Sequence, residues 1–226
     1  MQHSVAFGVK DAHGLVIHAV VSLQDVTEIH SRLQDNLRIQ ARLEKEIALR
    51  RRMETKLIER ATIDFLTGIH NRRSFLAQLS KEVRRANRYR HDLALLYLDI
   101  DHFKNVNDEW GHLTGDTVLK LLTALCAEEI RDVDTLGRLG GEEFGIVLPE
   151  TALEPARMVA ERIAARVRRN TLSKDGRAIV FTVSLGVAQL QPGQTLESLM
   201  HQADQALYVA KRNGRDQVKA AGDPVS

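Results

Sequence analysis

The chain has 226 residues, of which 43% are hydrophobic and 27% are charged, an ordinary globular composition with enough apolar material for a core. Lysine and arginine total 32 against 30 aspartates and glutamates, so the net charge of +2 gives no broad attraction to nucleic acid or anionic membranes. The single cysteine, Cys126, excludes an intramolecular disulfide, and no apolar run is long enough to cross a bilayer. We therefore expect a cytoplasmic protein with no nucleic acid partner and no membrane segment.

Residues 1–27 predict a β-hairpin. Strands are expected at residues 5–9 and 15–23, separated by a turn at 11–14. A lone hairpin is marginal in water, so we expect this one to be the end of a larger domain whose earlier part lies outside this chain. The hairpin and the following Gln24-Asp25-Val26-Thr27-Glu28 resemble the end of PAS sensor domains, where a last strand leads through an Asp-x-Thr turn into an output helix.

Residues 28–60 predict one long helix, because the segment lacks glycine and proline and alternates charges of both signs with spaced Leu, Ile and Met. When Leu33 is placed at an a position, half of the a and d positions are apolar. Two interpretations remain, a solvated linker helix and a weak parallel coiled coil that joins two chains and can change register. The coiled coil is favoured, since a long helix with no globular body of its own must bury its apolar stripe somewhere.

From residue 61 to residue 220, helical and strand patterns alternate, and a short tail follows at 221–226. A hairpin signal, Gly140-Gly141-Glu142-Glu143, separates two of the strands. The pattern predicts an α+β fold, with a mixed central sheet covered by helices and a long N-terminal helix before it. The expected helices are 71–90, 114–130, 152–170 and 195–213, and the expected strands are 93–100, 135–139, 144–148 and 180–188.

Four acidic residues occupy positions that the stability of a fold does not by itself explain. Asp99 and Asp101 close a leucine-rich strand, with both side chains expected on one side. Glu142 and Glu143 occupy the hairpin tip behind two glycines, which permit positive φ and close approach of a bulky ligand. If strand and hairpin are neighbours, these carboxylates converge, and a divalent cation such as magnesium would neutralise them. On pattern alone, a simple turn and a solvated strand end explain these residues equally well.

Further polar residues offer contacts for a nucleotide. Lys104 can bind phosphate near such a metal, and Asn107 with Asp116 can pair with the edge of a base. Lys211 and Arg215 lie one helical turn apart and form a second candidate phosphate clamp. Each of these, taken singly, is better explained as a helix cap or a solvated basic end.

Together, the motifs resemble those of the GGDEF family of diguanylate cyclases over about residues 60–218. The resemblance implies a palm-like nucleotidyl cyclase fold. One departure is Asp216, where the family usually has asparagine, and we expect little effect from it. The matching segments are Asp64-Phe65-Leu66-Thr67-Gly68-Ile69-His70-Asn71-Arg72-Arg73, Asp99-Ile100-Asp101-His102-Phe103-Lys104 with Asn107-Asp108, Gly111-His112 with Gly115-Asp116, Arg138-Leu139-Gly140-Gly141-Glu142-Glu143-Phe144, and 203–215.

The resemblance also implies roles for individual residues, around GTP held across the hairpin and two divalent ions, Mg²⁺ or Mn²⁺, in each active half-site. The implied catalytic residues are Glu143, Glu142, Asp99 and Lys104. The implied metal ligands are Asp99, the backbone carbonyl of Ile100, Glu142 and Glu143. The implied substrate contacts are Phe103, Lys104, Asn107, Asp116, Gly140, Gly141, Lys211 and Arg215.

The implied reaction condenses two GTP into cyclic di-GMP and two pyrophosphates, in a homodimer that helix 28–60 pairs. Five residues separate Asp134 from Gly140, which places Arg131-x-x-Asp134 where the family has its product-inhibition motif. Arg162 is a candidate secondary contact for the inhibitor, donated by a partner domain. The alternatives are a catalytically silent receptor for GTP or cyclic di-GMP and a dimerising structural module, which would leave the acids unexplained.

Overall fold

The computed structural model describes residues 2–24 and 27–223, and it divides between Lys56 and Leu57 into two compact units. The first unit contains the strands β1 (Gln2–Lys10) and β2 (Val16–Gln24) and most of helix α1 (Thr27–Thr62). The expected Asp-x-Thr turn includes residues 25–26, and the expected tail includes 224–226. Both of these stretches lie outside the described residues.

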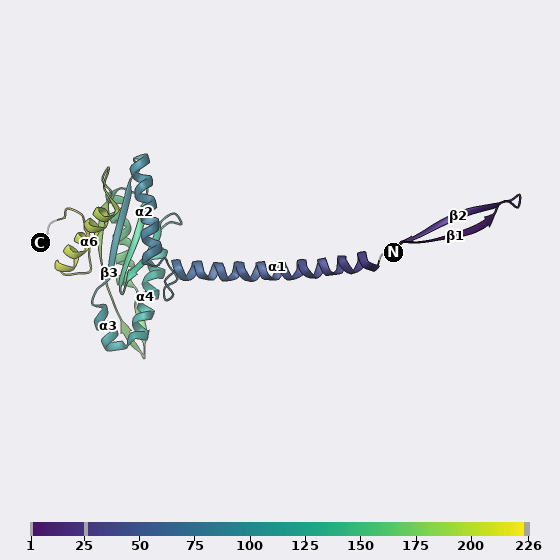
Figure 1. The fold of residues 1–226 in the computed structure, drawn as a ribbon. Coiled ribbons are helices and arrows are strands. Elements are labelled where there is room, and N and C mark those ends of the chain that lie inside the picture. Colours follow the sequence, from purple (N-terminus) through teal and green to yellow (C-terminus); the bar gives the residue numbers. More distant parts are fainter. Residues whose placement is uncertain (1, 25–26, 224–226) are drawn as a thin grey trace. The chain divides into compact units, whose positions relative to one another are not determined.

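Strands β1 and β2 confirm the predicted hairpin and make it longer than expected (Figure 1). The Asp11 carboxylate accepts hydrogen bonds from the backbone N–H groups of His13 and Leu15, both at 2.9 Å, which folds the turn. Apolar side chains of the hairpin remain exposed, with Leu15 at 70%. The hairpin therefore presents an apolar surface of the kind that a partner covers, while its origin in a PAS domain stays a prediction.

Helix α1 confirms the long helix predicted over residues 28–60. In its described part, Leu33, Leu37, Leu43 and Ile47 are each between 50% and 56% exposed. These residues form an apolar stripe that a second helix can cover, and the coiled coil itself stays a prediction. Among the described helices, none has both the length and the apolar character of a membrane span.

The second unit is built on a five-stranded mixed sheet (Figure 1). The central strand, β3, is buried along its whole length, and only the last pair of strands is parallel. This sheet and the helices that cover it confirm the predicted α+β class. In spatial order, the strands are β4 (Thr135–Gly140), β5 (Glu143–Pro149), β3 (Leu93–Ile100), β8 (Val183–Gln189) and β9 (Val218–Ala220).

Helices cover both faces of the sheet. Asn71 and Thr195 start two of them, because their side chains accept hydrogen bonds from the N–H groups of Ser74 and Ser198. The helices are α2 (Arg72–Tyr89) and α6 (Leu196–Arg212) on one face, and α4 (His112–Ala127) and α5 (Leu153–Arg169) on the other.

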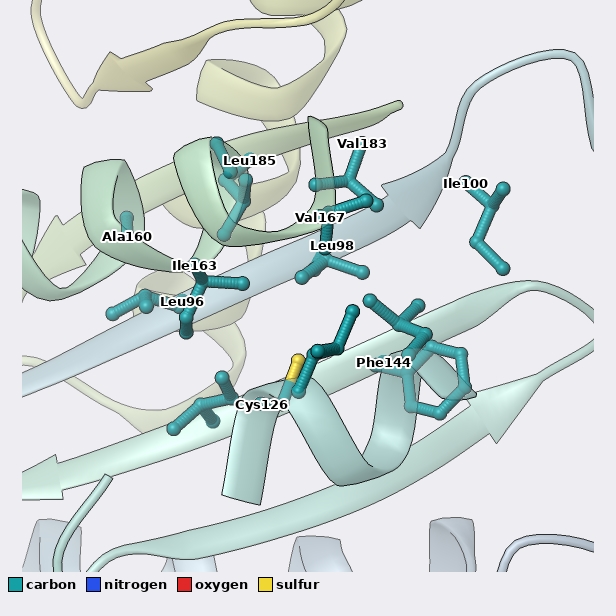
Figure 2. Close-up of a cluster of buried hydrophobic side chains, with 14 of the residues drawn as sticks. Leu96, Leu98, Ile100, Cys126, Phe144, Ala160, Ile163, Val167, Val183 and Leu185 are labelled. Carbon is teal, nitrogen blue, oxygen red and sulfur yellow. The ribbon is translucent and has the colours of Figure 1, made fainter. Parts of the chain in front are cut away.

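Strand β3 contributes to two cores, because successive side chains of a strand point to opposite faces. Leu95 and Tyr97 pack with residues of α2 and α6, whereas Leu96 and Leu98 pack with residues of α4 and α5. Figure 2 shows the second core, in which Cys126 lies among aliphatic side chains. Burial raises the pKa of the Cys126 thiol to about 12, so this cysteine is a core residue and not a nucleophile.

The structure contains short elements that the sequence pattern does not indicate, namely α3 (Phe103–Trp110), β6 (Leu172–Lys174), β7 (Arg177–Ile179) and β9. Three-residue strands are too short to show a period, and α3 follows His102, whose φ of 55° is not that of a usual N-cap. Boundaries also differ: α4 ends at Ala127 rather than 130, and β8 begins at Val183 rather than 180.

Phe75 of α2 is fully buried against two glycines of the β4–β5 hairpin. A Cβ atom at Gly137 would lie 2.6 Å from Phe75 Cδ2, and one at Gly145 would overlap the end of the ring. The absence of side chains at both positions creates the space for the ring. This contact fixes α2 on the strands that carry the Gly140-Gly141 tip.

We predict that Gly145→Ala lowers the free energy of unfolding by about 2 kcal/mol, because the added methyl group forces the Phe75 ring to shift in a packed core. Denaturant unfolding measures the loss. In a Phe75→Leu background the smaller side chain leaves room, so the same substitution should cost less than about 1 kcal/mol. An equal cost in both backgrounds would contradict this explanation.

Candidate active site

The β4–β5 hairpin places its acids beside the end of β3. A register shift follows Arg138, and Gly140 and Gly141 have φ values of 156° and 48°, which confirms that the tip uses positive φ. Beyond the tip, Glu143 is the direct cross-strand neighbour of Asp99. The strand and the hairpin are therefore neighbours, which is the condition under which the sequence analysis expected the carboxylates to converge.

Asp99 is the buried acid of this site. Its Oδ2 lies 2.7 Å from the ammonium group of Lys211 at the end of α6. Burial raises the pKa of Asp99 to about 6, Glu142 and Glu143 add to the increase, and Lys211 opposes it. The surroundings of Asp99 thus concentrate negative charge, which a cation stabilises.

Asp101, expected beside Asp99, is instead committed to hydrogen bonds within the fold. Its carboxylate accepts bonds from Thr182 Oγ1 and Ser184 Oγ, both at 2.7 Å, and from the backbone N–H of Asp216 at 2.9 Å. These donors satisfy a carboxylate that is almost completely buried. Asp101 therefore anchors the end of β3 to neighbouring segments.

The donors around Asp99 fit a divalent cation that arrives with a nucleotide. Within residues 2–24 and 27–223, no group of three or more His, Cys, Asp or Glu side chains is arranged to hold a metal by itself. Magnesium is commonly bound by one or two protein carboxylates together with water and substrate phosphates. Asp99 and the partly exposed Glu142 and Glu143 meet that requirement, and Lys211 already places a positive charge against Asp99.

Helices α3 and α4 form the corner that carries the predicted base contacts. Phe103 is buried, whereas Asn107 and Asp116 are partly exposed. At Gly115, a Cβ atom would overlap Asn107 Oδ1 and lie 3.1 Å from Phe103 Cζ. Gly115, which the sequence analysis quoted in the Gly115-Asp116 segment without giving it a role, therefore leaves the space that Asn107 and Phe103 occupy.

The predicted phosphate contacts are divided between two elements. Lys104 is exposed on α3, and Arg215 is exposed just after α6. Lys211, predicted to act with Arg215 on phosphate, makes an ion pair with Asp99 in the structure, and its phosphate role stays a prediction. The structure thus places Lys211 directly beside the buried carboxylate of Asp99.

An ion pair that the motif analysis did not identify fixes the hairpin tip. The Arg138 guanidinium donates to the Gly141 carbonyl oxygen at 2.9 and 2.8 Å and pairs with Asp64 at 3.1 Å. Although burial raises it, hydrogen bonds from Thr67 and Arg138 hold the pKa of Asp64 below its usual value. Because Asp64 follows α1 closely, this pair links the tip to the segment after that helix.

Arg131, Asp134 and Arg162 line one cavity of about 530 Å³ on the surface of the second unit. Arg131 pairs with Asp134 at 2.8 Å and also donates to Thr151 Oγ1 at 2.9 Å. Arg162 reaches the cavity from α5 and pairs with Glu129 at 2.9 Å. The three residues therefore lie together within one chain, whereas Arg162 was expected to reach the inhibitor from a partner domain.

The chain belongs to the family described as "Diguanylate cyclase, GGDEF domain", whose profile matches residues 61–217. It is 41% identical over 163 residues to the diguanylate cyclase DgcP of Pseudomonas aeruginosa, a match that covers 72% of this chain and 24% of DgcP. The chain spans less than half the length of the curated relatives it matches. The homologues and the fold agree with the predicted enzyme class.

Two solved structures are similar to this one. The coiled coil and GGDEF domain of DgcB from Caulobacter crescentus, in complex with c-di-GMP, gives a TM-score of 0.73 at 32% identity, covering 85% of this chain and 99% of that one. The active GGEEF domain of a diguanylate cyclase from Vibrio cholerae gives a TM-score of 0.64 at 37% identity, covering 68% and 98%.

We predict that Asp99→Asn stabilises the metal-free protein by about 1–2 kcal/mol at pH 7. The pKa of Asp99 is about 6 in the folded chain, against an ordinary value of 3.8, so the folded state binds this proton more tightly than the unfolded state. The stabilisation of the folded state by protonated Asp99 is therefore complete below pH 3.8 and is lost as the pH rises through 6. Denaturant unfolding in a chelator, at several pH values across this window, measures the effect.

The matched control is Asp108→Asn, at an exposed aspartate on α3. This variant should show the same dependence of the free energy of unfolding on pH as the unsubstituted chain. If Asp99→Asn showed that same profile, burial of the Asp99 charge would not be costly.

Proposed function

We propose that this chain is a diguanylate cyclase that condenses two GTP into cyclic di-GMP and two pyrophosphates. The observation that carries the proposal is the pairing of Asp99 with Glu143 across neighbouring strands, directly beside the glycine tip. The tip has the same GGEEF sequence that is named for the active Vibrio cholerae domain, at Gly140-Gly141-Glu142-Glu143-Phe144.

In this proposal, Asp99, the Ile100 carbonyl and Glu142 hold divalent ions, with Glu143 as a further ligand or as the proton acceptor. When bound, Mg²⁺ or Mn²⁺, two per half-site, polarises the α-phosphate and offsets the charge on the leaving pyrophosphate. The ribose 3′-oxygen of one GTP bonds to the α-phosphorus of the other as the bond to pyrophosphate breaks. In its role as proton acceptor, Glu143 takes up the hydroxyl proton beside Glu142, the residue that precedes it.

The remaining site residues orient the nucleotide. Lys104, Lys211 and Arg215 supply positive charge for the phosphates. Asn107 and Asp116, in the corner that Gly115 keeps open, offer donors and acceptors for the guanine edge, and Phe103 supports them. Gly140 and Gly141 leave the tip without side chains, so the nucleotide can cross the hairpin closely.

Two copies of the chain must face each other, because the product is two-fold symmetric and each domain binds one GTP. The half-exposed stripe of α1 offers the means of pairing, since a coiled coil raises the effective concentration of one half-site for the other. The DgcB structure supports this proposal: it contains a coiled coil and matches more of this chain than residues 61–217.

We assign residues 1–27 to a PAS-like sensor end, 28–60 to a coiled-coil signalling helix and 61–220 to the catalytic domain. The exposed apolar hairpin and the stripe on α1 support the first two assignments. A cytoplasmic location is proposed on the single cysteine, which suits a reducing compartment.

The cavity at Arg131, Asp134 and Arg162 is proposed to bind cyclic di-GMP as an inhibitor. An arginine fork reads a guanine edge with two hydrogen bonds, and a carboxylate accepts its N–H groups. The complexes of DgcB with c-di-GMP support a product site in such domains. Binding at this cavity without turnover defines the second candidate function, a silent receptor.

We predict that the chain with GTP and Mg²⁺ forms cyclic di-GMP, at a rate per chain that rises with protein concentration. Glu143→Gln should reduce kcat by at least about 100-fold, because an amide accepts no proton, while the fold is retained. Chromatography of the nucleotides measures turnover, and Glu154→Gln at an exposed position of α5 is the control. Detectable GTP binding without product, also in a forced dimer, would favour the receptor.

We predict that Arg131→Ala weakens inhibition by added cyclic di-GMP by about 10-fold or more, because the substitution removes the guanidinium that faces the cavity. Initial rates over a series of product concentrations measure the change. The control Arg157→Ala, at an arginine of α5, should be inhibited like the unsubstituted chain. Unchanged inhibition in Arg131→Ala would place the inhibitor elsewhere.

A further inference from the structure

The loop after α6 holds Arg215 in an unusual backbone conformation. Gly214, Arg215 and Asp216 have φ values of 105°, 65° and 48° in succession. Residues with a Cβ atom rarely occupy this left-handed region, and two in a row persist only where the surrounding structure fixes them. Arg215 is one of the residues to which phosphate binding is assigned above.

Asp216 is fixed from the side of α5 by Arg168. The Arg168 guanidinium donates from Nε to Oδ2 and from Nη2 to Oδ1, both at 2.8 Å. Nη2 also donates to the backbone carbonyl of Asp216 at 3.1 Å. Two parallel bonds between a guanidinium and a carboxylate fix orientation as well as distance.

Asp216 is fixed from the side of the sheet by Asp101. Its backbone N–H donates to Asp101 Oδ2 at 2.9 Å, and Asp101 is itself held by Thr182 and Ser184 of the adjacent segment. Asp101 lies two residues after Asp99 in the chain. The loop that carries Arg215 is thereby connected to the strand that carries the buried acid of the site.

We propose that Arg168 and Asp216 are positioning residues, which hold the backbone of Arg215 so that its guanidinium reaches the nucleotide phosphates. The inference rests on the proposed function and names a residue pair that acts through Arg215. It replaces the expectation that aspartate at position 216 has little effect. Asparagine has one side-chain oxygen and would turn an NH₂ group towards the Arg168 fork, so it cannot reproduce the two parallel bonds.

The pair is partly accessible to solvent, with exposed side-chain fractions of 51% for Arg168 and 35% for Asp216. Its contribution is therefore expected to be moderate and to decrease as salt is added. This sensitivity distinguishes the ion pair from a packing contact, which salt leaves unchanged.

The test compares Asp216→Asn, Arg168→Gln and the double variant. Asparagine still tolerates positive φ and keeps the N–H that bonds to Asp101, so Asp216→Asn removes the ion pair alone. The first readout is the affinity for a non-hydrolysable GTP analogue with Mg²⁺, and the second is the division of any rate change between KM and kcat.

We expect each single variant to weaken binding of the analogue and raise KM about threefold to tenfold, with kcat changed less than about twofold. The double variant should be no weaker than the worse single variant, because both remove the same interaction. Arg168→Lys keeps the charge without the fork and should be intermediate. Arg169→Gln, at the neighbouring exposed residue, is the control.

If Asp216→Asn and Arg168→Gln bound the analogue like the control, or if their effects were additive, the positioning role would be wrong, while turnover by the unsubstituted chain would leave the proposed function intact. If the unsubstituted chain bound the analogue but formed no product from GTP, also in a forced dimer, the cyclase proposal would fail and the affinities would still decide the positioning role. If Arg168→Gln failed to fold, Asp216→Asn and Arg168→Lys would decide it.

Discussion

The burial of one carboxylate, Asp99, at the end of the central strand is the constraint on which the site depends. Strand β3 is buried along its whole length, so its last acid is removed from water with the rest. Burial disfavours the charged form, and the adjacent Glu142 and Glu143 add to that cost. The positive charge of Lys211 offsets part of this cost, and a nucleotide-bound metal ion would offset more of it.

Placing Glu143 opposite Asp99 requires that the β4–β5 hairpin be held firmly, and its glycines do this in two ways. Those inside the strands, Gly137 and Gly145, admit the Phe75 ring and so attach the hairpin to α2. Those at the tip accept positive φ, and Arg138 ties the carbonyl of Gly141 to the chain after α1. Core packing and the ion pair thus both fix the part of the hairpin that carries the acids.

The parts of the fold that a local pattern encodes were predictable, and the contacts between distant segments were not. The strand and turn signals located Asp99 at the end of β3 and the other acids at the hairpin tip, and the observed strand register makes Asp99 and Glu143 neighbours. The Arg138–Asp64 pair joins residues 74 positions apart, and no periodicity marks such a contact. Lys211 was expected to contact phosphate, and the sequence could not show that the end of α6 also brings it beside the buried Asp99.

Local sequence patterns also could not reveal the contact between Asp216 and Arg168 of α5, because the two residues are 48 positions apart in the sequence. Arg168 directly follows Val167, which is fully buried in the core of α5 and the sheet. Close-packed interiors resist displacement, so the fork of Arg168 is presented from a fixed position although its own side chain meets solvent. The loop at 213–217 is therefore bonded to α5 through Arg168 and to the end of β3 through Asp101, and these contacts hold its two left-handed residues in place.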